Sequence, residues 1–454
     1  MEQRIFACGG PSHLLVGAIL VLLGQFCPTA GLPHTAAPVV EGKPFMVIWN
    51  APVTECRRLD VPLDMSAFQA VTTPASEPDQ FLTLFYKNRM ALYPYTDYET
   101  LQEFHGGIPQ KGNLSASLDK ARADLSAYVP TASAGLALLD WEQWRPLFDR
   151  DWGTKEIYRK LSVSYAREND PSLAPQQAAA RAKEQFQAAA RSFMEDTLKV
   201  AIGERPNYLW GFYLFPNCYN YGETEPGYTG KCAGTTQRLN DQLLWLWDTS
   251  TALYPSVYLP TSLRGKHSAA LFARNQVHEA MRVSALPKHP YTAPVYVYSQ
   301  PLFRDQNELY LAEGDLVRTI GESAAVGASG SVLWGGSSAY TNKELCQNLS
   351  YYLLSTLNPY TANVTAATKV CSDMLCQSNG RCVRKDYDTD TYLHLNPQNF
   401  YIDNFDGRYI VTGVPSYSDV EYLYDNFACQ CYAGRSCSAQ MPSWLPMTPL
   451  VIYV

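Results

Sequence analysis

The sequence predicts an α/β fold, a parallel β-barrel or doubly wound sheet, followed by a small module held by disulfides. Short apolar, β-branched or aromatic runs alternate with longer helical stretches from residue 43 to about residue 359, the pattern of a parallel sheet covered by helices. A chain of 454 residues is long enough for a barrel of roughly 250 or more residues plus an appended module. Six cysteines crowd into the last fifth of the chain, a density typical of disulfide modules.

Seven of the short runs are expected to be strands. They cover residues 45–49, 81–86, 135–140, 209–215, 255–259, 295–298 and 331–334. The clearest helix is predicted over about residues 176–202, because Phe186, Ala190, Phe193, Thr197 and Val200 fall on one face at spacings of three and four. Residues 392–401 and 409–413 are expected to form two further strands inserted in the cysteine-rich module.

The chain is divided by these signals into four parts. Arg4, the apolar run 14–23 and the small residues that end near Ala30 predict a secretory signal over residues 1–30. The apolar run is too short to span a bilayer comfortably. We expect a catalytic barrel domain over residues 31–360, a disulfide module over 361–437 and a tail over 438–454.

An oxidising compartment is consistent with the cysteines and the glycosylation sequons. Loss of the signal removes Cys8 and Cys27 and leaves ten cysteines, so we expect five disulfides and no reactive thiol. Asn113, Asn348 and Asn363 head N-x-S/T triplets, which predicts glycosylation on a secretory route.

Several function classes lack support in the sequence. The formal net charge is −7 with no long basic run, which excludes the usual footprint of nucleic-acid binders, although a local positive groove could still bind an anion. No predicted strand is followed by a dinucleotide or ATP motif. The cysteines lack C-x2-C spacing and accompanying His residues, and H-E-x-x-H fails at Arg282 after His278 and Glu279, which we expect on a helix surface. We therefore predict no metal and no cofactor.

Two acids at the end of the predicted strand 135–140 are the strongest chemical signal. Side chains alternate along a strand, so Asp140 and Glu142 should project to one side, about 7 Å apart along the backbone, at the mouth where barrel enzymes keep their active sites. Two close carboxylates tend to hold one proton, and a raised pKa makes a usable general acid. The alternative is structural: Asp140 caps a helix and Glu142 pairs with Arg145. The neighbouring Trp141 and Trp144 favour the functional interpretation, because an exposed Trp is costly unless it stacks on something.

Three motifs of the chain are distinctive: Leu139-Asp140-Trp141-Glu142-x-Trp144-Arg145-Pro146, Leu209-Trp210-Gly211-Phe212-Tyr213 and Thr319-Ile320-Gly321-Glu322-Ser323-Ala324-Ala325. On these motifs the chain closely resembles the animal hyaluronidases of glycoside hydrolase family 56, over about residues 44–437. Pro62–Ser66, Asn358–Tyr360 and Tyr392–Pro397 are most similar to the sperm-surface and cell-surface branch. The resemblance implies a distorted (β/α) TIM-like barrel followed by an EGF-like module. It also implies the disulfides Cys56–Cys346, Cys218–Cys232, Cys371–Cys382, Cys376–Cys429 and Cys431–Cys437.

Family membership would imply an endo-acting, retaining hydrolase that cleaves β-1,4 N-acetylglucosaminide linkages of hyaluronan by substrate-assisted catalysis. Glu142 matches the acid that protonates the glycosidic oxygen, and Asp140 matches the residue that orients the substrate's N-acetyl group. Tyr213 and Tyr258 match tyrosines that hydrogen-bond this group or the charge developing near it. The matched groove residues that contact sugars are Tyr86, Arg145, Ser256, Tyr296 and Trp334.

Two positions near the predicted site depart from the family pattern, and a third departure, Met90-Ala91 in place of a commoner Leu-Gly, is expected to change packing only. Asn217 stands where most relatives have Asp and is expected near the substrate, where the lost charge could shift the pH optimum. Gln276 replaces a common Arg and would remove one contact to substrate carboxylates.

Other interpretations stay open from the sequence. The chain could prefer chondroitin, or it could be a hyaluronan-binding or gamete-adhesion protein without useful catalysis. We expect a secreted monomer, with a lipid-anchored cell-surface form or a lysosomal or acrosomal location as the alternatives.

Overall fold

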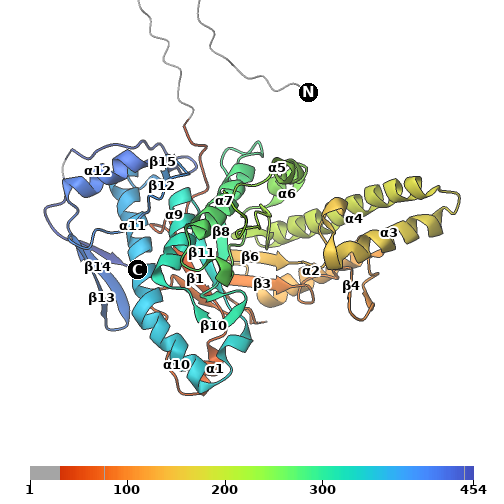
Figure 1. The fold of residues 1–454 in the computed structure, drawn as a ribbon, viewed down its shortest axis with the longest axis horizontal. Coiled ribbons are helices and arrows are strands. Elements are labelled where there is room, and N and C mark those ends of the chain that lie inside the picture. Colours follow the sequence, from red (N-terminus) through yellow and green to blue (C-terminus); the bar gives the residue numbers. More distant parts are fainter. Residues whose placement is uncertain (1–30, 76, 444) are drawn as a thin grey trace, which may run out of the picture. The chain divides into compact units, whose positions relative to one another are not determined.

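Two parallel sheets form the centre of the protein in the computed structural model, which describes residues 31–75, 77–443 and 445–454 (Figure 1). The expected signal, with Cys8 and Cys27, lies outside the described residues. One sheet has the order β2-β1-β11-β8 and the other the order β3-β6-β7. The strands are β1 (Met46–Asn50), β2 (Ala70–Thr72), β3 (Leu82–Tyr86), β6 (Gly135–Asp140), β7 (Tyr208–Phe212), β8 (Tyr296–Ser299) and β11 (Gly330–Trp334).

The two sheets are joined by residues 253–256, which complete the barrel wall without forming a regular strand. Isolated bridges pair Tyr213 with Tyr254, and Ser256 with Tyr298. The expected strand 255–259 is therefore wrong as a ladder, because Pro255 has no N–H to donate to a neighbour. Gly211 of β7 makes the close approach possible, since a Cβ there would lie 2.2 Å from the carbonyl oxygen of Ala252. Among the described residues, no ladder joins β2 to β3.

Both faces of the sheets are buried, which explains why the strands are almost continuously apolar. Leu84 and Leu138 face the barrel interior with Ile48 and Val332. Phe85 and Leu139, one residue further along each strand, pack into the larger core beneath the helices. The barrel expected from the sequence is confirmed, and β6 has the predicted bounds.

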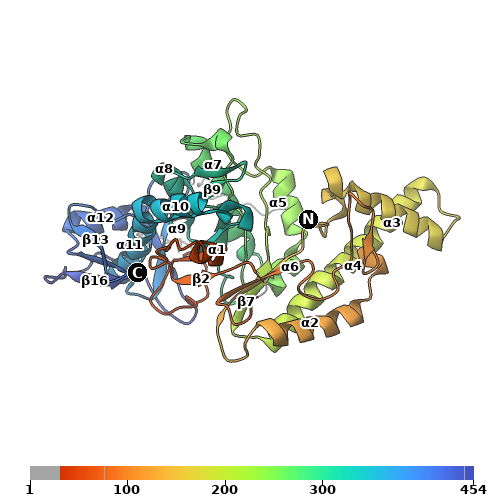
Figure 2. The ribbon, with the colours of Figure 1, turned by 90° about the horizontal axis from the view of Figure 1, so that it is seen from below.

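Helices surround the barrel, and the pair α3 and α4 lies side by side at one flank (Figures 1 and 2). Helix α4 (Pro175–Glu204) confirms the helix predicted over 176–202, and its apolar stripe is buried. The other helices are α1 (Thr54–Arg58), α2 (Leu114–Tyr128), α3 (Glu156–Asn169), α5 (Gly234–Asp241), α6 (Leu244–Thr249), α7 (His267–Ser284), α8 (Glu313–Leu316), α9 (Glu322–Val326), α10 (Lys343–Tyr352), α11 (Asn358–Cys376) and α12 (Tyr417–Asn426). None of the helices in the described segments has the length and apolarity that a membrane span requires.

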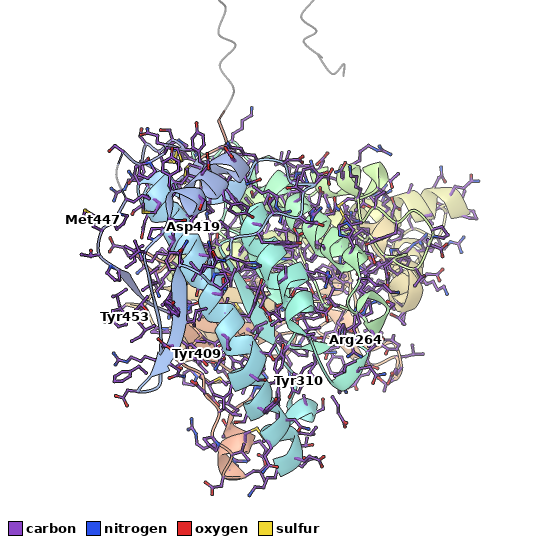
Figure 3. All side chains as sticks on the ribbon, turned by 60° about the vertical axis from the view of Figure 1, so that its left-hand side comes forward. Arg264, Tyr310, Tyr409, Asp419, Met447 and Tyr453 are labelled. Atoms are coloured by element: carbon purple, nitrogen blue, oxygen red, sulfur yellow. A yellow bond between two sulfur atoms is a disulfide. The ribbon has the colours of Figure 1, made fainter. Side chains whose placement is uncertain are left out.

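The C-terminal part contains two small antiparallel sheets beside α11 and α12. Strand β12 (Gly380–Arg384) pairs with β15 (Phe427–Cys431), and β14 (Arg408–Gly413) lies between β13 (Phe400–Phe405) and β16 (Leu450–Tyr453). The expected strand 392–401 is wrong except at its end, because β13 begins only at Phe400. The expected tail contributes β16, whose Tyr453 lies opposite Ile410 of β14; Figure 3 labels Tyr453 and, on β14, Tyr409. The boundary expected at 360/361 falls inside helix α11.

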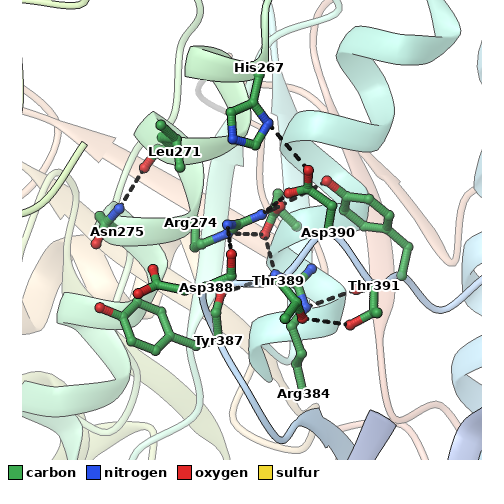
Figure 4. A network of polar contacts seen from close by, with 12 residues as sticks. His267, Leu271, Arg274, Asn275, Arg384, Tyr387, Asp388, Thr389, Asp390 and Thr391 are labelled. Carbon is green, nitrogen blue, oxygen red and sulfur yellow. Dashed lines mark hydrogen bonds and ion pairs between the residues drawn. The ribbon is translucent and has the colours of Figure 1, made fainter. Parts of the chain in front are cut away.

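A buried ionic network fastens the C-terminal part to the barrel helices (Figure 4). Glu322 of α9 accepts hydrogen bonds from Arg274 of α7 at 2.6 Å and from Arg384 of β12 at 3.0 Å, and all three side chains are fully buried. Arg274 also pairs with Asp390 at 2.5 Å, and the Tyr392 hydroxyl donates to Glu322 at 2.9 Å.

His278 and Glu279 do not lie on a helix surface, contrary to expectation. The Glu279 side chain is 1% exposed and accepts hydrogen bonds from Asn240 at 2.6 Å and from Arg282 at 2.8 Å. The His278 ring stacks on Tyr387 at 4.0 Å. Tyr387 of the C-terminal part covers helix α7 at His278, and Asn240 of α5 covers it at Glu279. These two polar side chains are therefore packed against other residues and do not face solvent.

All five disulfides implied by the family resemblance are present. Cys56–Cys346 joins α1 to α10 across 290 residues. The others are Cys218–Cys232, Cys371–Cys382, Cys376–Cys429 and Cys431–Cys437.

Of the three sequons, two are exposed and one is enclosed. Asn113 caps α2, and its Oδ1 accepts the Ala116 N–H. Asn348 is exposed on α10. Asn363 lies within α11, and its Oδ1 accepts the Leu395 N–H at 3.0 Å. The fold therefore leaves room for glycans at Asn113 and Asn348, whereas a glycan at Asn363 would compete with packing of the 392–397 segment.

Candidate active site

A small cavity lies at the carboxyl ends of the barrel strands. Its volume is about 160 Å³, and its lining residues come from six places in the barrel wall: Leu84, Asp140, Glu142, Tyr213, Tyr258, Tyr298 and Trp334. Asp140 ends β6 and Trp334 ends β11, whereas Tyr213 and Tyr258 follow β7 and the bridging segment 253–256. The cavity is therefore at the mouth where TIM-like barrels hold their catalytic groups.

Asp140 and Glu142 line this cavity together, as strand alternation predicts. The residue between them points the other way: the Trp141 ring is buried 4.6 Å from the Tyr93 ring. Trp144 is buried too, with its Nε1 donating to the Pro94 carbonyl oxygen at 2.7 Å. The expectation that these tryptophans are exposed is wrong. They anchor the end of β6 in the core and so fix the direction of the two acids.

The surroundings of the two acids do not fit the structural alternative, in which Asp140 caps a helix and Glu142 pairs with Arg145. Asp140 Oδ1 is buried without a hydrogen-bond partner among the described residues. Arg145 donates to the Arg150 carbonyl oxygen at 2.9 Å and not to Glu142. An unpaired buried acceptor is costly, and it belongs to a residue that lines the cavity.

The surroundings of the two carboxyl groups favour a proton on Asp140. Burial, followed by the charge of Glu142 and a hydrogen bond with it, raises the pKa of Asp140 to about 8. The nearby Lys155 acts in the opposite direction. Such a shift favours retention of one proton by the pair at neutral pH. The raised pKa belongs to Asp140, which is half-buried.

Aromatic side chains form the remaining walls of the cavity. Burial, reinforced by the charge of Glu142, raises the pKa of Tyr213, so its hydroxyl stays a hydrogen-bond donor. This hydroxyl lies 3.5 Å from Ser256 Oγ. The Tyr258 ring stacks on Trp334 with centroids 6.1 Å apart, and Trp334 Nε1 donates to the Tyr86 hydroxyl at 3.1 Å. The predicted residues Tyr86, Ser256 and Trp334 are thus brought to the cavity or to its edge.

Tyr296 is not among the residues that line this cavity. Its ring stacks on Tyr254 with centroids 6.2 Å apart in the barrel interior. Tyr298, two residues further along β8 and on the same face, lines the cavity instead. The period of two would have found Tyr298 if the position of the barrel mouth along β8 had been known.

A second cavity adjoins the first on the other side of Glu142. Glu142 and Tyr213 line both cavities. The second cavity holds the predicted residues Arg145 and Asn217, together with residues to which the sequence assigned no contact with substrate: Trp141, Trp144, Arg150, Lys155, Leu214, Phe215 and Tyr219.

The two positions that depart from the family pattern are in contact beside this cavity. Gln276 Nε2 lies 3.4 Å from Asn217 Oδ1, and Gln276 Oε1 accepts the Cys218 N–H at 2.9 Å. Asn217 Oδ1 also accepts the Tyr219 N–H at 2.7 Å. Both side chains are buried, so the two departures form one neutral amide pair that supports the loop around Cys218.

Comparisons with known proteins point in the same direction as the geometry. The glycoside hydrolase family 56 model described as "Hyaluronidase" matches residues 34–441. The chain is 42% identical over 409 residues to Hyaluronidase PH-20 of Homo sapiens, covering 89% of this chain and 80% of the relative. It is 44% identical over 407 residues to Hyaluronidase-5 of Mus musculus, covering 88% of this chain and 77% of the relative. A solved structure of bee venom hyaluronidase in complex with hyaluronic acid tetramer is similar with a TM-score of 0.62 and 28% identity, covering 70% of this chain and 98% of that chain.

Proposed function

The chain belongs to the hyaluronidase family, glycoside hydrolase family 56, and from this we propose that it is an endo-acting hydrolase of hyaluronan. The bond cleaved is the β-1,4 linkage that follows N-acetylglucosamine, and the anomeric configuration is retained. One observation carries the proposal: a proton-sharing Asp140–Glu142 pair, with an unpaired Asp140 oxygen, lines a cavity whose other walls are tyrosine and tryptophan.

The reaction begins with the acetamido group of the bound sugar. Its N–H donates to the free Oδ1 of Asp140, which turns the acetamido oxygen toward the anomeric carbon. Glu142 gives its proton to the glycosidic oxygen as the bond from that oxygen to the anomeric carbon breaks. The acetamido oxygen forms the new bond to this carbon, so the substrate supplies the nucleophile.

The second half of the reaction restores the enzyme. Glu142, now a carboxylate, takes a proton from water while the water oxygen attacks the anomeric carbon and the acetamido oxygen leaves. Two inversions at this carbon give net retention. The hydroxyls of Tyr213 and Tyr258 lie at the same cavity and donate to the acetamido group as its charge changes, and Asp140 stabilises the positive intermediate.

Digestion of hyaluronan tests this proposal directly. The purified protein is expected to produce even-numbered oligosaccharides whose average length falls gradually, the pattern of internal cleavage. NMR of the first products should show the β anomer. A first-formed α anomer would contradict the retaining mechanism, and no turnover would contradict the enzyme assignment. The same assay on chondroitin shows which polymer is preferred.

The fall of activity at alkaline pH should reflect loss of the proton held by Asp140 and Glu142. We predict that kcat/KM for hyaluronan falls as the pH rises through about 8, because above this pH both carboxyl groups ionise and no proton donor remains. In Asp140→Asn the residual activity should no longer fall near pH 8, since the group with the raised pKa is gone. If kcat/KM of the wild type already fell at about pH 4, the ordinary pKa of a carboxylic acid, proton sharing would be contradicted.

Three further assignments belong to the same proposal. Residues 1–30 act as a secretory signal, and the mature protein is an extracellular monomer, secreted or attached to the cell surface. Residues 361–437 form an EGF-like module, which is supported by the three disulfides among its cysteines. Glycans are carried by Asn113 and Asn348, which the fold leaves exposed.

A further inference from the structure

Three basic side chains converge on the second cavity, where Glu142 is the one acidic side chain of the lining. Arg145, Arg150 and Lys155 line it together with Glu142. Within the described residues, the ion pairs closer than 4.0 Å involve other basic residues. Asp151 lies next to Arg145 and accepts its backbone N–H at 2.7 Å, but burial raises the pKa of Asp151 well above its usual range. The cavity therefore gathers positive charge in a protein whose net charge is −7.

The three basic side chains differ in how far their N–H groups are used in hydrogen bonds within the protein. The Arg150 guanidinium is buried and donates to Asn240 Oδ1 at 2.9 Å and to the Thr236 carbonyl oxygen at 3.1 Å. It is part of the support of the cavity.

Arg145 and Lys155 are less committed. The Arg145 guanidinium is half-buried, stacks over the Trp152 ring at 4.8 Å, and uses one nitrogen to reach the Arg150 carbonyl oxygen. Lys155 Nζ donates to the backbone carbonyl oxygen of Glu142 and lies 3.5 Å from that of Gln143. Both side chains keep further N–H groups that can turn toward a ligand in the cavity.

The two cavities have opposite character on either side of Glu142. The first is lined by Asp140, tyrosines and Trp334, with no Lys or Arg in its lining. The second contains all three cations. Because Glu142 protonates the bridging oxygen, the sugar that holds the acetamido group lies on one side of it and the leaving sugar on the other. In a polymer that alternates hexosamine and uronate, the leaving sugar is the uronate.

We propose that Lys155 and Arg145 form the binding site for the carboxylate of the uronate that leaves after cleavage. This assignment rests on the proposed function, and it names the substrate group that the second cavity selects. Lys155 supplies a charge next to the backbone of the general acid. Arg145, held flat by Trp152, supplies planar donors that suit a carboxylate.

Lys155→Met tests the site by comparing hyaluronan with its fully methyl-esterified form, which lacks the carboxylate charge. On hyaluronan the variant should lose about 10- to 100-fold in kcat/KM, mainly through KM, as expected for one charged hydrogen bond. The wild type should cleave the ester less well than hyaluronan, and the ratio between the two substrates should fall toward one in Lys155→Met. Lys155→Arg should keep most of the ratio, and Lys160→Met, at an exposed lysine of α3, should match the wild type on both substrates.

An oligosaccharide with 4-nitrophenol in place of the leaving uronate locates the effect. The loss caused by Lys155→Met should shrink on this substrate, whereas an undiminished loss would move the carboxylate site elsewhere and overturn the proposal. An equal loss on hyaluronan and on its ester, in both Lys155→Met and Lys155→Gln, would also overturn it, because Lys155 would then act only by holding Glu142. A wild type that cleaves neither polymer would instead refute the proposed function.

Discussion

Glu142→Gln is expected to lose hyaluronan hydrolysis by about 10²- to 10⁴-fold or more in kcat while it still binds the polymer. The amide keeps the shape of the side chain but has no acidic proton for the glycosidic oxygen. Fold and binding should persist, because Glu142 is exposed and its contact with Lys155 is made through the backbone carbonyl oxygen. Turnover is measured by reducing-end release, and binding by calorimetry with hyaluronan oligosaccharides.

The matched control for this variant is Glu156→Gln, at an exposed acid of the nearby α3, which should retain wild-type turnover. If Glu142→Gln and the wild type turned over hyaluronan equally, Glu142 could not be the general acid. If binding were lost together with turnover, the variant would instead point to a role in holding the substrate.

Glu322→Gln is expected to lower the free energy of unfolding by about 3–5 kcal/mol. The substitution removes the one charge that faces both Arg274 and Arg384, which are fully buried. Two guanidinium groups would then be left in the interior with insufficient compensation, because Asp390, which is half-exposed, pairs with Arg274 and not with Arg384. Urea unfolding followed by tryptophan fluorescence measures the change.

Glu313→Gln serves as the control, since Glu313 is exposed at the first turn of α8 and should change the unfolding free energy by less than about 0.5 kcal/mol. A Glu322→Gln protein as stable as the wild type would show that the network contributes no net stability. Its turnover of hyaluronan below the unfolding transition should stay near that of the wild type, because none of these residues lines either cavity.

Local sequence patterns were sufficient to predict the elements and residues whose buried and exposed positions recur with a regular period along the chain. Helix α4 and strand β6 follow from periodicity alone, and the shared direction of Asp140 and Glu142 follows from the same rule. The neighbouring tryptophans show the limit of this reasoning. Trp141 and Trp144 were expected to be exposed, yet they are buried against Tyr93 and Pro94, because the loop that covers them lies some fifty residues earlier in the chain.

Other limits have the same origin in tertiary placement. Choosing between Tyr296 and Tyr298 required the depth of the barrel mouth along β8, which depends on how neighbouring strands are staggered. A loop and short helical turns separate Lys155 from Glu142 in the chain. Nothing in the local sequence indicates that the Lys155 ammonium group lies next to Glu142. The disulfide pairs could be named only through the family resemblance, because spacing does not choose among connectivities.

The helical run through α10 and α11 links the barrel to the C-terminal part without a hinge. The π-helical segment Leu353–Leu357 joins α10 to α11, so the chain stays helical from Lys343 to Cys376. One end is tied by Cys346 to Cys56, and the other by Cys371 and Cys376 to β12 and β15. The molecule should therefore melt cooperatively, in one calorimetric transition. A truncation after residue 360 would cut this continuous helix and expose apolar surface on both fragments. Neither fragment is therefore suitable for expression on its own.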